Sequence, residues 1–353
     1  MTARLTSRRK LDHLRICCEE DVECGDPGFD DVLLIHRALP ECDMDGITLR
    51  TRFLNGCFES PLFIAGMTGG HREAKEVNRR LAIAAEKFGI GMGVGSQRAA
   101  LEDPSLEGTF SIVREVAPHA FLCANLGIVQ LRDRGIEWAE RAVEMIDAQA
   151  LVIHLNFLQE AIQPEGDHRA TGCLDALREL CRSFRRPVIV KETGAGIDGG
   201  TARTILSAGA GAIDIGGTGG TSWAAVETIR AGKKGVEGEI FNGWGIPTVL
   251  SLCEVARTGA PVIATGGVRN GLHIAKCIAL GASMAGMALP LLRAAMAGEE
   301  ALMSTVERIH RELRIAMFLT GSCSIYELKH ARTIVTGRTR EMVELFMEER
   351  DGY

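Results

Sequence analysis

The sequence contains no long apolar run. Nothing in its 353 residues approaches the length of a membrane-spanning helix, and the basic N-terminal stretch MTARLTSRRKLDHLRI lacks the apolar core of a signal peptide. We therefore predict a cytoplasmic protein that does not contact a membrane. Linkers rich in proline and serine are also missing, so nothing marks the boundary of the two-domain split that chain length alone would allow.

Paired cysteine motifs are absent too. The 11 cysteines, an odd number, are scattered from Cys17 to Cys323 without a Cys-x-x-Cys pair, which indicates neither a disulfide framework nor a zinc site. Most are expected to be small buried apolar residues, and a reactive pair at Cys17 and Cys18 is the less favoured alternative. The net charge of -6 provides no electrostatic footprint for nucleic acid.

Past residue 60 the chain shows short apolar runs spaced at roughly 30 residues, as successive βα units are. They cover residues 62–65, 90–94, 120–124, 150–155, 187–190, 212–215, 261–264 and 283–287. Helical stretches lie between them, including residues 73–88, which Gly89 ends, and a helix that Asp103 and Pro104 begin. Eight strands alternating with helices predict an α/β fold, a closed (β/α)8 TIM barrel over residues 61–300. Residues 1–60 would form an N-terminal extension, and residues 301–353 would form C-terminal helices packed on the barrel, one of them over residues 339–349.

Polar residues and glycines follow every predicted strand. Turn formation explains the glycines one at a time, but it does not explain why so many hydrogen-bonding side chains reach one rim. In a barrel that rim is the functional face, because the carboxyl ends of all strands meet there. The side chains concerned are Ser96, Asn125, His154, Lys191, Thr221 and Arg269.

The fourth predicted strand ends in the densest polar cluster. Strand alternation places His154 and Asn156 on one face, and Gln159 and Glu160 lie just past the strand end. Buried polar groups are costly unless they meet each other or a ligand. Taken alone, the cluster is therefore either a binding site or a polar network satisfied by its own members.

Turns expected to point backbone N–H groups at one spot follow the sixth, seventh and eighth strands, with Arg269 nearby; the strongest glycine signals are Gly216 to Thr221 and Gly266-Gly267. Barrels commonly bind phosphate at this place, through backbone N–H groups. Met67 to Gly69, with Lys191 across the barrel, suits a flat polar ring that needs close backbone approach on one side and a cation on the other. Flavin mononucleotide (FMN) has both a phosphate group and a flat polar ring, and so fits both features.

Seven segments, in this order, resemble the type 2 isopentenyl diphosphate isomerases, which are FMN-dependent barrels. They are RKLDH at 9–13, MTGG at 67–70, GSQR at 95–98, HLNFLQE at 154–160, KETG at 191–194, GGTS at 219–222 and GGVR at 266–269. The glycine pieces recur across FMN barrels. The Arg-Lys-x-x-His start, the Ser-Gln-Arg turn and the His-x-Asn-x-x-Gln-Glu segment are together specific.

The resemblance implies isomerisation of isopentenyl diphosphate to dimethylallyl diphosphate by proton addition and removal with reduced FMN, in isoprenoid biosynthesis. NADPH or NADH would be needed only to reduce the flavin. It implies FMN contacts from Met67, Thr68, Gly69, Ser96, Asn125, Lys191, Thr221, Gly267, Arg269, Ala288 and Leu289. It implies substrate contacts from Arg9, Lys10, His13, Ser96, Gln97, Arg98 and Gln159.

The resemblance also assigns roles at the reacting carbons. His154, Asn156 and Gln159 would be the catalytic residues, with Gln159 positioning the substrate or relaying a proton. Glu160 is the candidate ligand for a Mg2+ that bridges the diphosphate, because Mg2+ takes few carboxylates and completes its shell with phosphate and water. Relatives are homo-oligomers, so a tetramer or octamer is expected.

The N-terminal basic residues have two readings. A basic head such as RRK at 8–10 is usually a solvated tail. If Ser7 caps a short helix, however, Arg9 and His13 share one face of it, and the segment suits a lid that closes over a diphosphate.

Two redox enzymes and a non-catalytic barrel compete with the isomerase. A dehydrogenase acting on inosine monophosphate needs a nucleophilic cysteine after the sixth strand, yet no cysteine lies between Cys181 and Cys253. A 2-hydroxy-acid oxidase needs a histidine beside Arg269, and the turn from Thr265 to Val268 has none. A flavin- or phosphate-binding sensor would not require the polar cluster at the fourth strand.

Overall fold

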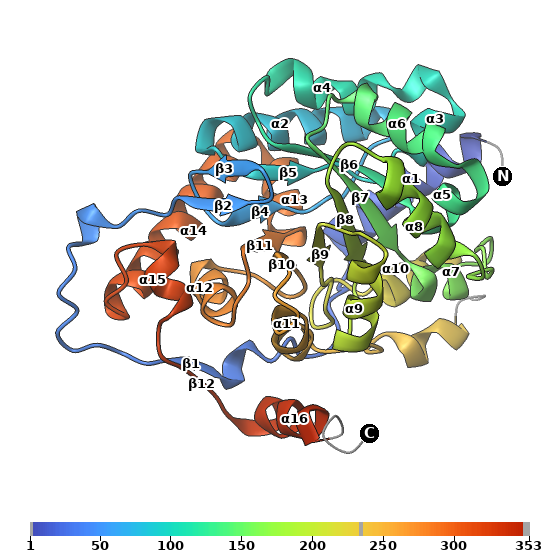
Figure 1. Ribbon diagram of the computed structural model, residues 1–353. Coiled ribbons are helices and arrows are strands. Elements are labelled where there is room, and N and C mark those ends of the chain that lie inside the picture. The colour runs from blue at the N-terminus through green and yellow to red at the C-terminus, as the bar shows by residue number, and fades with distance from the viewer. Residues whose placement is uncertain (1–2, 233–235, 349–353) are drawn as a thin grey trace.

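Eight parallel strands close into a barrel at the centre of the computed structural model, which describes residues 3–232 and 236–348 (Figure 1). Around the barrel they follow the order β4 to β11, and β11 pairs with β4 to complete the ring. Their bounds are β4 Leu62–Ile64, β5 Gly91–Gly93, β6 Leu122–Gly127, β7 Ala150–Leu155, β8 Val188–Glu192, β9 Ala212–Asp214, β10 Val262–Ala264 and β11 Met284–Met287. Each overlaps one of the eight apolar runs, although β6 and β8 extend past the ends of theirs, so the predicted barrel is confirmed.

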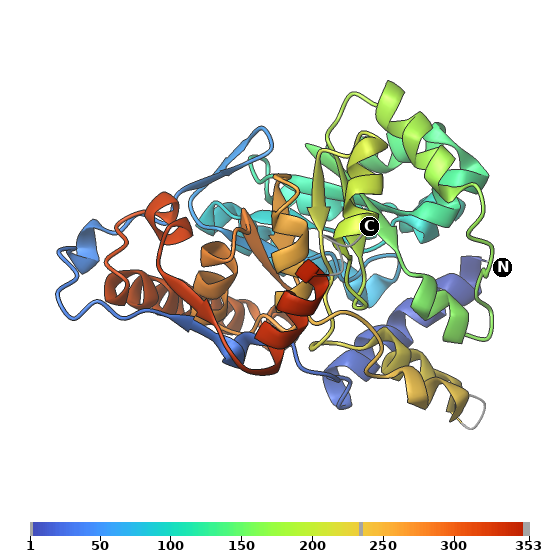
Figure 2. The same ribbon diagram turned by 60° about the horizontal axis from the view of Figure 1, so that its bottom comes forward.

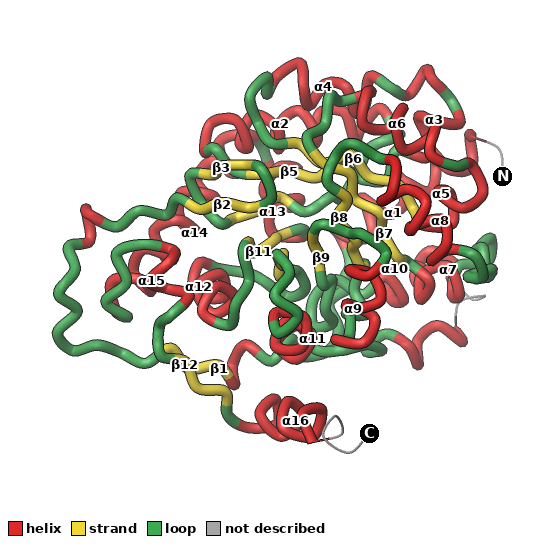
Figure 3. Tube along the Cα trace, in the orientation of Figure 1, coloured by secondary structure: helices red, strands yellow, loops and turns green. Residues whose placement is uncertain are grey.

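Helices alternate with the strands and cover the outside of the barrel, as the colouring of Figure 3 shows. The longer ones are α2 Arg72–Phe88, α4 Gly108–Val116, α5 Ile128–Arg134, α6 Ile136–Met145, α8 Cys173–Ser183, α9 Gly199–Ser207, α10 Trp223–Ala231, α11 Thr248–Ala256, α12 Gly271–Ala279, α13 Leu289–Ala297 and α14 Glu299–Leu319. Short helices are α3 Arg98–Glu102, α7 Phe157–Ile162 and α15 Ile325–Lys329, with 3-10 turns at Phe29–Asp31, Met44–Gly46, Pro104–Leu106 and Val236–Phe241.

Two helix boundaries expected from the sequence are reproduced. Helix α2 ends at Gly89, whose φ of 59° is the left-handed conformation that glycine adopts without strain. Asp103 caps the turn Pro104–Leu106 by accepting a hydrogen bond of 3.1 Å from the Ser105 N–H. That turn is 3-10, and the α-helix that follows it begins only at Gly108.

A small apolar cluster, separate from the main hydrophobic core, closes the amino-terminal end of the barrel. It contains Ala150 and Ala212, the first residues of β7 and β9, together with Phe53 and Phe58. The two phenylalanines belong to the antiparallel hairpin β2 Thr51–Phe53 and β3 Gly56–Phe58. Burial of two aromatic side chains seals this end, which leaves the carboxyl ends of the strands as the open end.

Both termini pack on the barrel. Helix α1 spans Ala3–Glu19 and runs beside α10 (Figure 2). Strand β1 Val32–Leu34 pairs with β12 Thr333–Val335, and α16 Gly337–Glu348 follows. The expected helix over residues 339–349 is therefore present, and its last predicted residue lies outside the described ones. No helix within residues 3–232 and 236–348 has the length and apolar character needed to cross a membrane.

Ser7 does not cap α1. The helix begins at Ala3, so Ser7 lies within it rather than at its N-cap. Ala3, Arg4 and Leu5 are all good helix formers, which explains why the helix extends past the serine.

Candidate active site at the barrel mouth

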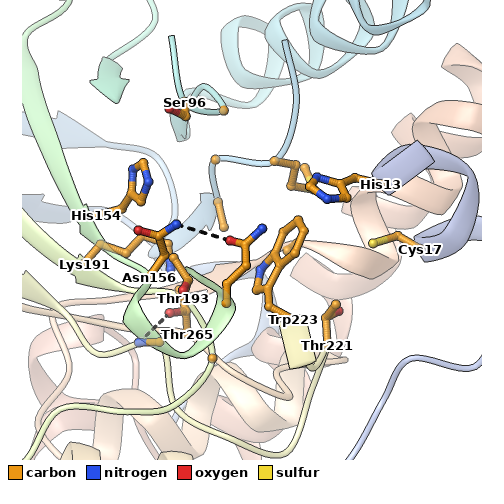
Figure 4. Close-up of a pocket in the computed structure, with 18 of the residues that line it drawn as sticks. His13, Cys17, Ser96, His154, Asn156, Lys191, Thr193, Thr221, Trp223 and Thr265 are labelled. Atoms are coloured by element: carbon orange, nitrogen blue, oxygen red, sulfur yellow. Dashed lines mark hydrogen bonds between the residues drawn. The ribbon is translucent and has the colours of Figure 1, made fainter. Parts of the chain in front are cut away.

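A cavity opens at the carboxyl ends of the strands, with α1 along one side (Figure 4). With the open solvent at its mouth, it encloses about 1540 Å3 of space that no protein atom fills. All but two of the predicted site residues line it: Arg9, Lys10, His13, Met67, Thr68, Ser96, Arg98, Asn125, His154, Asn156, Gln159, Glu160, Lys191, Thr221, Gly267, Arg269, Ala288 and Leu289.

The predicted ligand Gln97 does not line the cavity. Its side chain is fully buried, donates to the Ala142 carbonyl oxygen at 2.8 Å and accepts from the Asn125 N–H at 2.8 Å. The expected direct contact between Gln97 and substrate is therefore corrected. Gln97 instead supports the backbone of Asn125 from behind.

Gly69 is the second predicted ligand that lies off the cavity wall. Its φ is 144°, and a Cβ added there would lie 2.0 Å from the ring of Phe110. The glycine is required because the loop after β4 packs directly on this ring. Its neighbours Met67 and Thr68 do face the cavity.

His154 reaches the cavity as a neutral imidazole. Burial, followed by the charges of Lys10 and Lys191, lowers the pKa of His154 to about 3. Its Nδ1 lies 2.7 Å from Asn125 Oδ1, and the Asn125 amide is oriented by a bond of 2.9 Å from Nδ2 to the Val94 carbonyl oxygen. Nδ1 therefore carries the hydrogen, and the lone pair of Nε2 is left to accept a hydrogen bond.

The amide of Gln159 is fixed at both ends. Its Nε2 donates to Glu227 Oε1 at 2.7 Å, and its Oε1 lies 3.4 Å from Asn156 Nδ2. Figure 4 shows Asn156 near His154 and Lys191, all three at the ends of neighbouring strands. The catalytic residues proposed from the sequence thus lie together in one wall of the cavity.

Glu227 is a fully buried carboxylate on α10 that the sequence did not reveal. Besides the Gln159 amide, it binds His13 Nε2 at 2.9 Å and Arg230 Nε at 2.6 Å. Burial by itself would raise the pKa of Glu227, but the hydrogen bonds from His13 and Gln159 and the charge of Arg230 outweigh it and lower the pKa to about 2. Glu227 therefore stays charged and joins α1 to the strand-four cluster.

Glu160 lies at the edge of the cavity with its carboxylate held in place. Oε1 accepts from Asn156 Nδ2 at 3.0 Å, and Oε2 accepts from the Gln163 amide and from the Asp167 N–H at 2.9 Å. Within the described part of the chain, no group of three or more histidine, cysteine, aspartate or glutamate side chains could hold a metal ion. Any metal here would need most of its ligands from substrate and water.

Positive charge gathers where α1 meets the cavity. Burial, followed by the charges of Arg9 and Arg98, lowers the pKa of Lys10 to about 8. Arg9 Nε is buried, and within the described residues it has no hydrogen-bond partner. Arg9 Nη1 lies 3.8 Å from Glu165, and Arg98 Nε donates to Glu102 at 2.8 Å, so both arginines have a counter-charge. Lys10 is the cation that burial and its positive neighbours destabilise, and an anionic ligand in the cavity would stabilise its charge.

The glycine turns after β9 and β10 pack back to back. A Cβ added at Gly220 would lie 2.5 Å from Gly267 N, so neither turn tolerates a side chain at the contact. Arg269 stands beside them and donates to Glu23 through Nε at 2.8 Å. Glu23 follows α1, and its pairing with this loop was not foreseen.

Trp223 is a cavity residue that the sequence reasoning missed. It follows Ser222, the N-cap of α10, and its ring meets the His13 ring edge to face at 5.0 Å between centroids. With Cys17, also on the wall, it adds apolar surface beside His13 (Figure 4). A tryptophan directly after the glycine turn was the available signal.

The chain is similar to known flavin proteins and isomerases. Residues 137–335 match the family model of FMN-dependent dehydrogenases. The isopentenyl-diphosphate delta-isomerase of Methanoregula boonei is 62% identical over 97% of both chains. That of Archaeoglobus fulgidus is 52% identical over 96% of this chain and 99% of its own.

Solved structures share the fold. A mandelate oxidase variant with a monooxide FMN adduct has a TM-score of 0.62 and 21% identity, covering 88% of this chain and 90% of its own. Another mandelate oxidase structure, with 2-hydroxy-phenylacetamide, has a TM-score of 0.64 and 18% identity, covering 95% and 99%. At this identity the likeness shows the barrel alone.

Proposed function

We propose, from the premise that the chain belongs to the family of isopentenyl-diphosphate delta-isomerases, that it converts isopentenyl diphosphate into dimethylallyl diphosphate at the barrel mouth. The observation that carries the proposal is the juxtaposition of two clusters in one cavity. One is the cation cluster of Arg9, Lys10 and Arg98, and the other is the polar wall of His154 and Gln159. The first suits a diphosphate and the second a short hydrocarbon next to it.

The residues present fit FMN. Thr68 Oγ1 is buried and faces the cavity, and within the described residues it lacks a hydrogen-bond partner. We place the flavin ring between Met67, Thr68 and Lys191, and the phosphate at the glycine turns near Arg269. Ser96, Asn125, Thr221, Gly267, Ala288 and Leu289 would complete the site. When bound in its reduced form, FMN supplies an electron-rich ring that can exchange a proton.

The diphosphate end rests on α1. Arg9, Lys10 and His13 project from one side of this helix, and Arg98 faces them from α3. We propose that Glu160 is the one protein carboxylate on a Mg2+ that the diphosphate and water otherwise coordinate. Residues 1–60 would then act as the lid of the barrel domain at 61–300, because α1 carries these contacts.

The reacting carbons would lie against His154, Asn156 and Gln159. Protonating an unactivated alkene creates a tertiary carbocation, so the site must exclude water and tolerate positive charge. Neutral His154 offers only the lone pair of Nε2, and Gln159, held by Glu227 and Asn156, presents a fixed amide. These groups orient substrate and hold a proton in transit, and the Trp223 ring adds apolar surface to the cavity wall that disfavours water.

An oxidase that shares the fold is the competing function. Such an enzyme needs a histidine base beside the cofactor, and the turn after β10 carries none. The next histidine along the chain, His273 on α12, stacks on Phe29 at 4.4 Å between centroids and does not line the cavity. The geometry therefore favours the isomerase.

Further features of the proposed enzyme follow the family resemblance. NADPH or NADH would reduce the flavin without being consumed in proportion to product. The protein would act in the cytoplasm as a homo-oligomer, a tetramer or an octamer, in isoprenoid biosynthesis. Sedimentation of the purified chain tests the assembly, and parallel reduction rates with the two nucleotides test the reductant.

One experiment tests the function. The purified protein is checked for bound yellow FMN, reduced anaerobically, and incubated with isopentenyl diphosphate and Mg2+ in deuterated water. Deuterium in dimethylallyl diphosphate that appears only with reduced flavin supports the isomerase. Consumption of NAD(P)H equal to the product formed would instead establish a redox enzyme, and bound flavin without either reaction would establish a sensor.

A further inference from the structure

Lys191 is held at the cavity wall by a carboxylate that does not itself reach the cavity. Asp214 ends β9 and is paired in register with Lys191 on β8, so the two side chains leave neighbouring strands side by side. Lys191 Nζ lies 3.6 Å from Asp214 Oδ2 and donates a hydrogen bond of 2.6 Å to the Glu192 carbonyl oxygen. Lys191 lines the cavity, whereas Asp214 is 2% exposed and lies behind it.

The second oxygen of Asp214 is bound from the next strand. Thr265, directly after β10, donates its hydroxyl hydrogen to Asp214 Oδ1 and accepts a hydrogen bond of 3.0 Å from the Gly216 N–H. Asp214 thus connects the side chains of three neighbouring strand ends. Lys191 and Thr265 both line the cavity, so the carboxylate holds two wall residues from behind.

A buried carboxylate at this place is costly. Burial raises the pKa of Asp214, and the charge of Lys191 and the Thr265 hydrogen bond act against that rise. A well-packed apolar side chain would fill the same space with no such penalty. The charge of Asp214 therefore either stabilises the packing of neighbouring strands or positions the Lys191 side chain. An experiment can separate these two roles.

We infer that Asp214 is a positioning residue, which holds the ammonium group of Lys191 at the point where that group meets the flavin. The inference rests on the proposed FMN site. It extends that site to a residue that does not touch the cofactor. Its defining consequence is that most of the effect of Asp214 on flavin binding depends on the presence of Lys191.

The test is a double-mutant cycle read by FMN affinity. Asp214→Asn removes the charge with almost no change in size and keeps an oxygen for Thr265. Apoprotein is titrated with FMN, and quenching of flavin fluorescence gives the dissociation constant. We expect Asp214→Asn to weaken FMN binding about tenfold when Lys191 is present and less than twofold in a Lys191→Met background.

Each contrary outcome has a distinct meaning. If Asp214→Asn weakens FMN binding equally in both backgrounds, Asp214 only stabilises the strands, and the inference is overturned. Unchanged FMN affinity when Lys191 is present would also overturn it. If Asp214→Asn does not fold, Asp214→Leu, which removes the charge and fills the same space with an apolar side chain, takes its place in the same cycle. A wild-type chain that binds no FMN would overturn the proposed function as well. If the wild type binds FMN but Asp214→Asn has the same effect with and without Lys191, only the inference is overturned.

Discussion

Gln159 donates a hydrogen bond of 2.7 Å to Glu227, which is fully buried on a helix 68 positions further along the chain. The same carboxylate binds His13 at 2.9 Å. One charged group therefore orients both the Gln159 amide, which we propose lies by the reacting carbons, and the His13 imidazole, which we propose lies by the diphosphate. Glu227 therefore connects α1 to the polar wall of the cavity.

Replacing Glu227 by Gln should lower turnover. A hydrogen bond to a charged partner contributes about 2 kcal/mol, so kcat is expected to fall by about 10- to 100-fold. The Michaelis constant should rise less, because Arg9 and Lys10 remain. Steady-state kinetics of Glu227→Gln against Glu140→Gln, an exposed carboxylate on α6, make the comparison. Equal kinetics in the two variants would remove Glu227 from the mechanism.

Gln159→Ala should act on turnover and not on the cofactor. The side chain meets Glu227 and Asn156 but none of the residues that we assign to the FMN phosphate. We expect kcat to fall by about 100-fold or more, with the FMN dissociation constant within about twofold of wild type. Turnover equal to wild type would contradict the assigned role.

Strand β7 and the glutamines Gln159 and Gln97 show which parts of the site can be predicted from the sequence. The apolar run at 150–155 predicts β7 to the residue, because a strand buried on both faces is continuously apolar. Topology then brings His154 and Gln159 to the barrel mouth without any knowledge of side-chain contacts. Gln97 sits in an equally persuasive motif, yet its direction is decided by Ala142 and the Asn125 backbone, which local sequence does not encode.

Glu227 shows the complementary failure. It occupies one position in the helix WAAVETIRA, where a single glutamate reads as an exposed residue. Its importance comes from His13, which lies 214 positions away, and only the packing of α1 on α10 joins them. Glu23 and Arg269 are similar, since their contact spans 246 positions. Ion pairs between residues far apart in the chain are therefore the part of the site that sequence patterns do not predict.

Glu160→Gln should raise the Mg2+ concentration needed for activity. The substitution removes the charge of the one carboxylate that we assign to the metal with almost no change in size, and it keeps one acceptor oxygen for the donors of Asn156, Gln163 and Asp167. The Mg2+ concentration at half-maximal rate is expected to increase about tenfold or more. Glu140→Gln again serves as the matched control. Superimposable metal titrations of wild type and Glu160→Gln would exclude the ligand role.

Gly69→Ala should destabilise the fold. The added methyl group would lie 2.0 Å from the Phe110 ring, and the φ of 144° is itself strained for any other residue. We expect a loss of about 2 to 4 kcal/mol in the free energy of unfolding, measured by urea denaturation. Gly243→Ala is the control, because a Cβ there meets nothing within 4 Å. A loss below that of the control would show that the loop relaxes freely.

Diphosphate binding should weaken as pH rises through about 8, the lowered pKa of Lys10. Below this pH the ammonium is charged and attracts the ligand; above it the amine is neutral. The stability of the unligated fold depends on pH in the opposite direction. The folded pKa lies under the ordinary value of 10.5, so the unfolded chain binds more protons between the two values, and the contribution of Lys10 to stability increases with pH there. Calorimetric titration with inorganic pyrophosphate from pH 7 to 9.5 measures the binding, with Lys10→Arg as the variant that keeps its charge throughout. Because pyrophosphate itself titrates equally in both experiments, the ratio of the two affinities isolates Lys10. A ratio that stays constant across this range would place the lysine outside the diphosphate site.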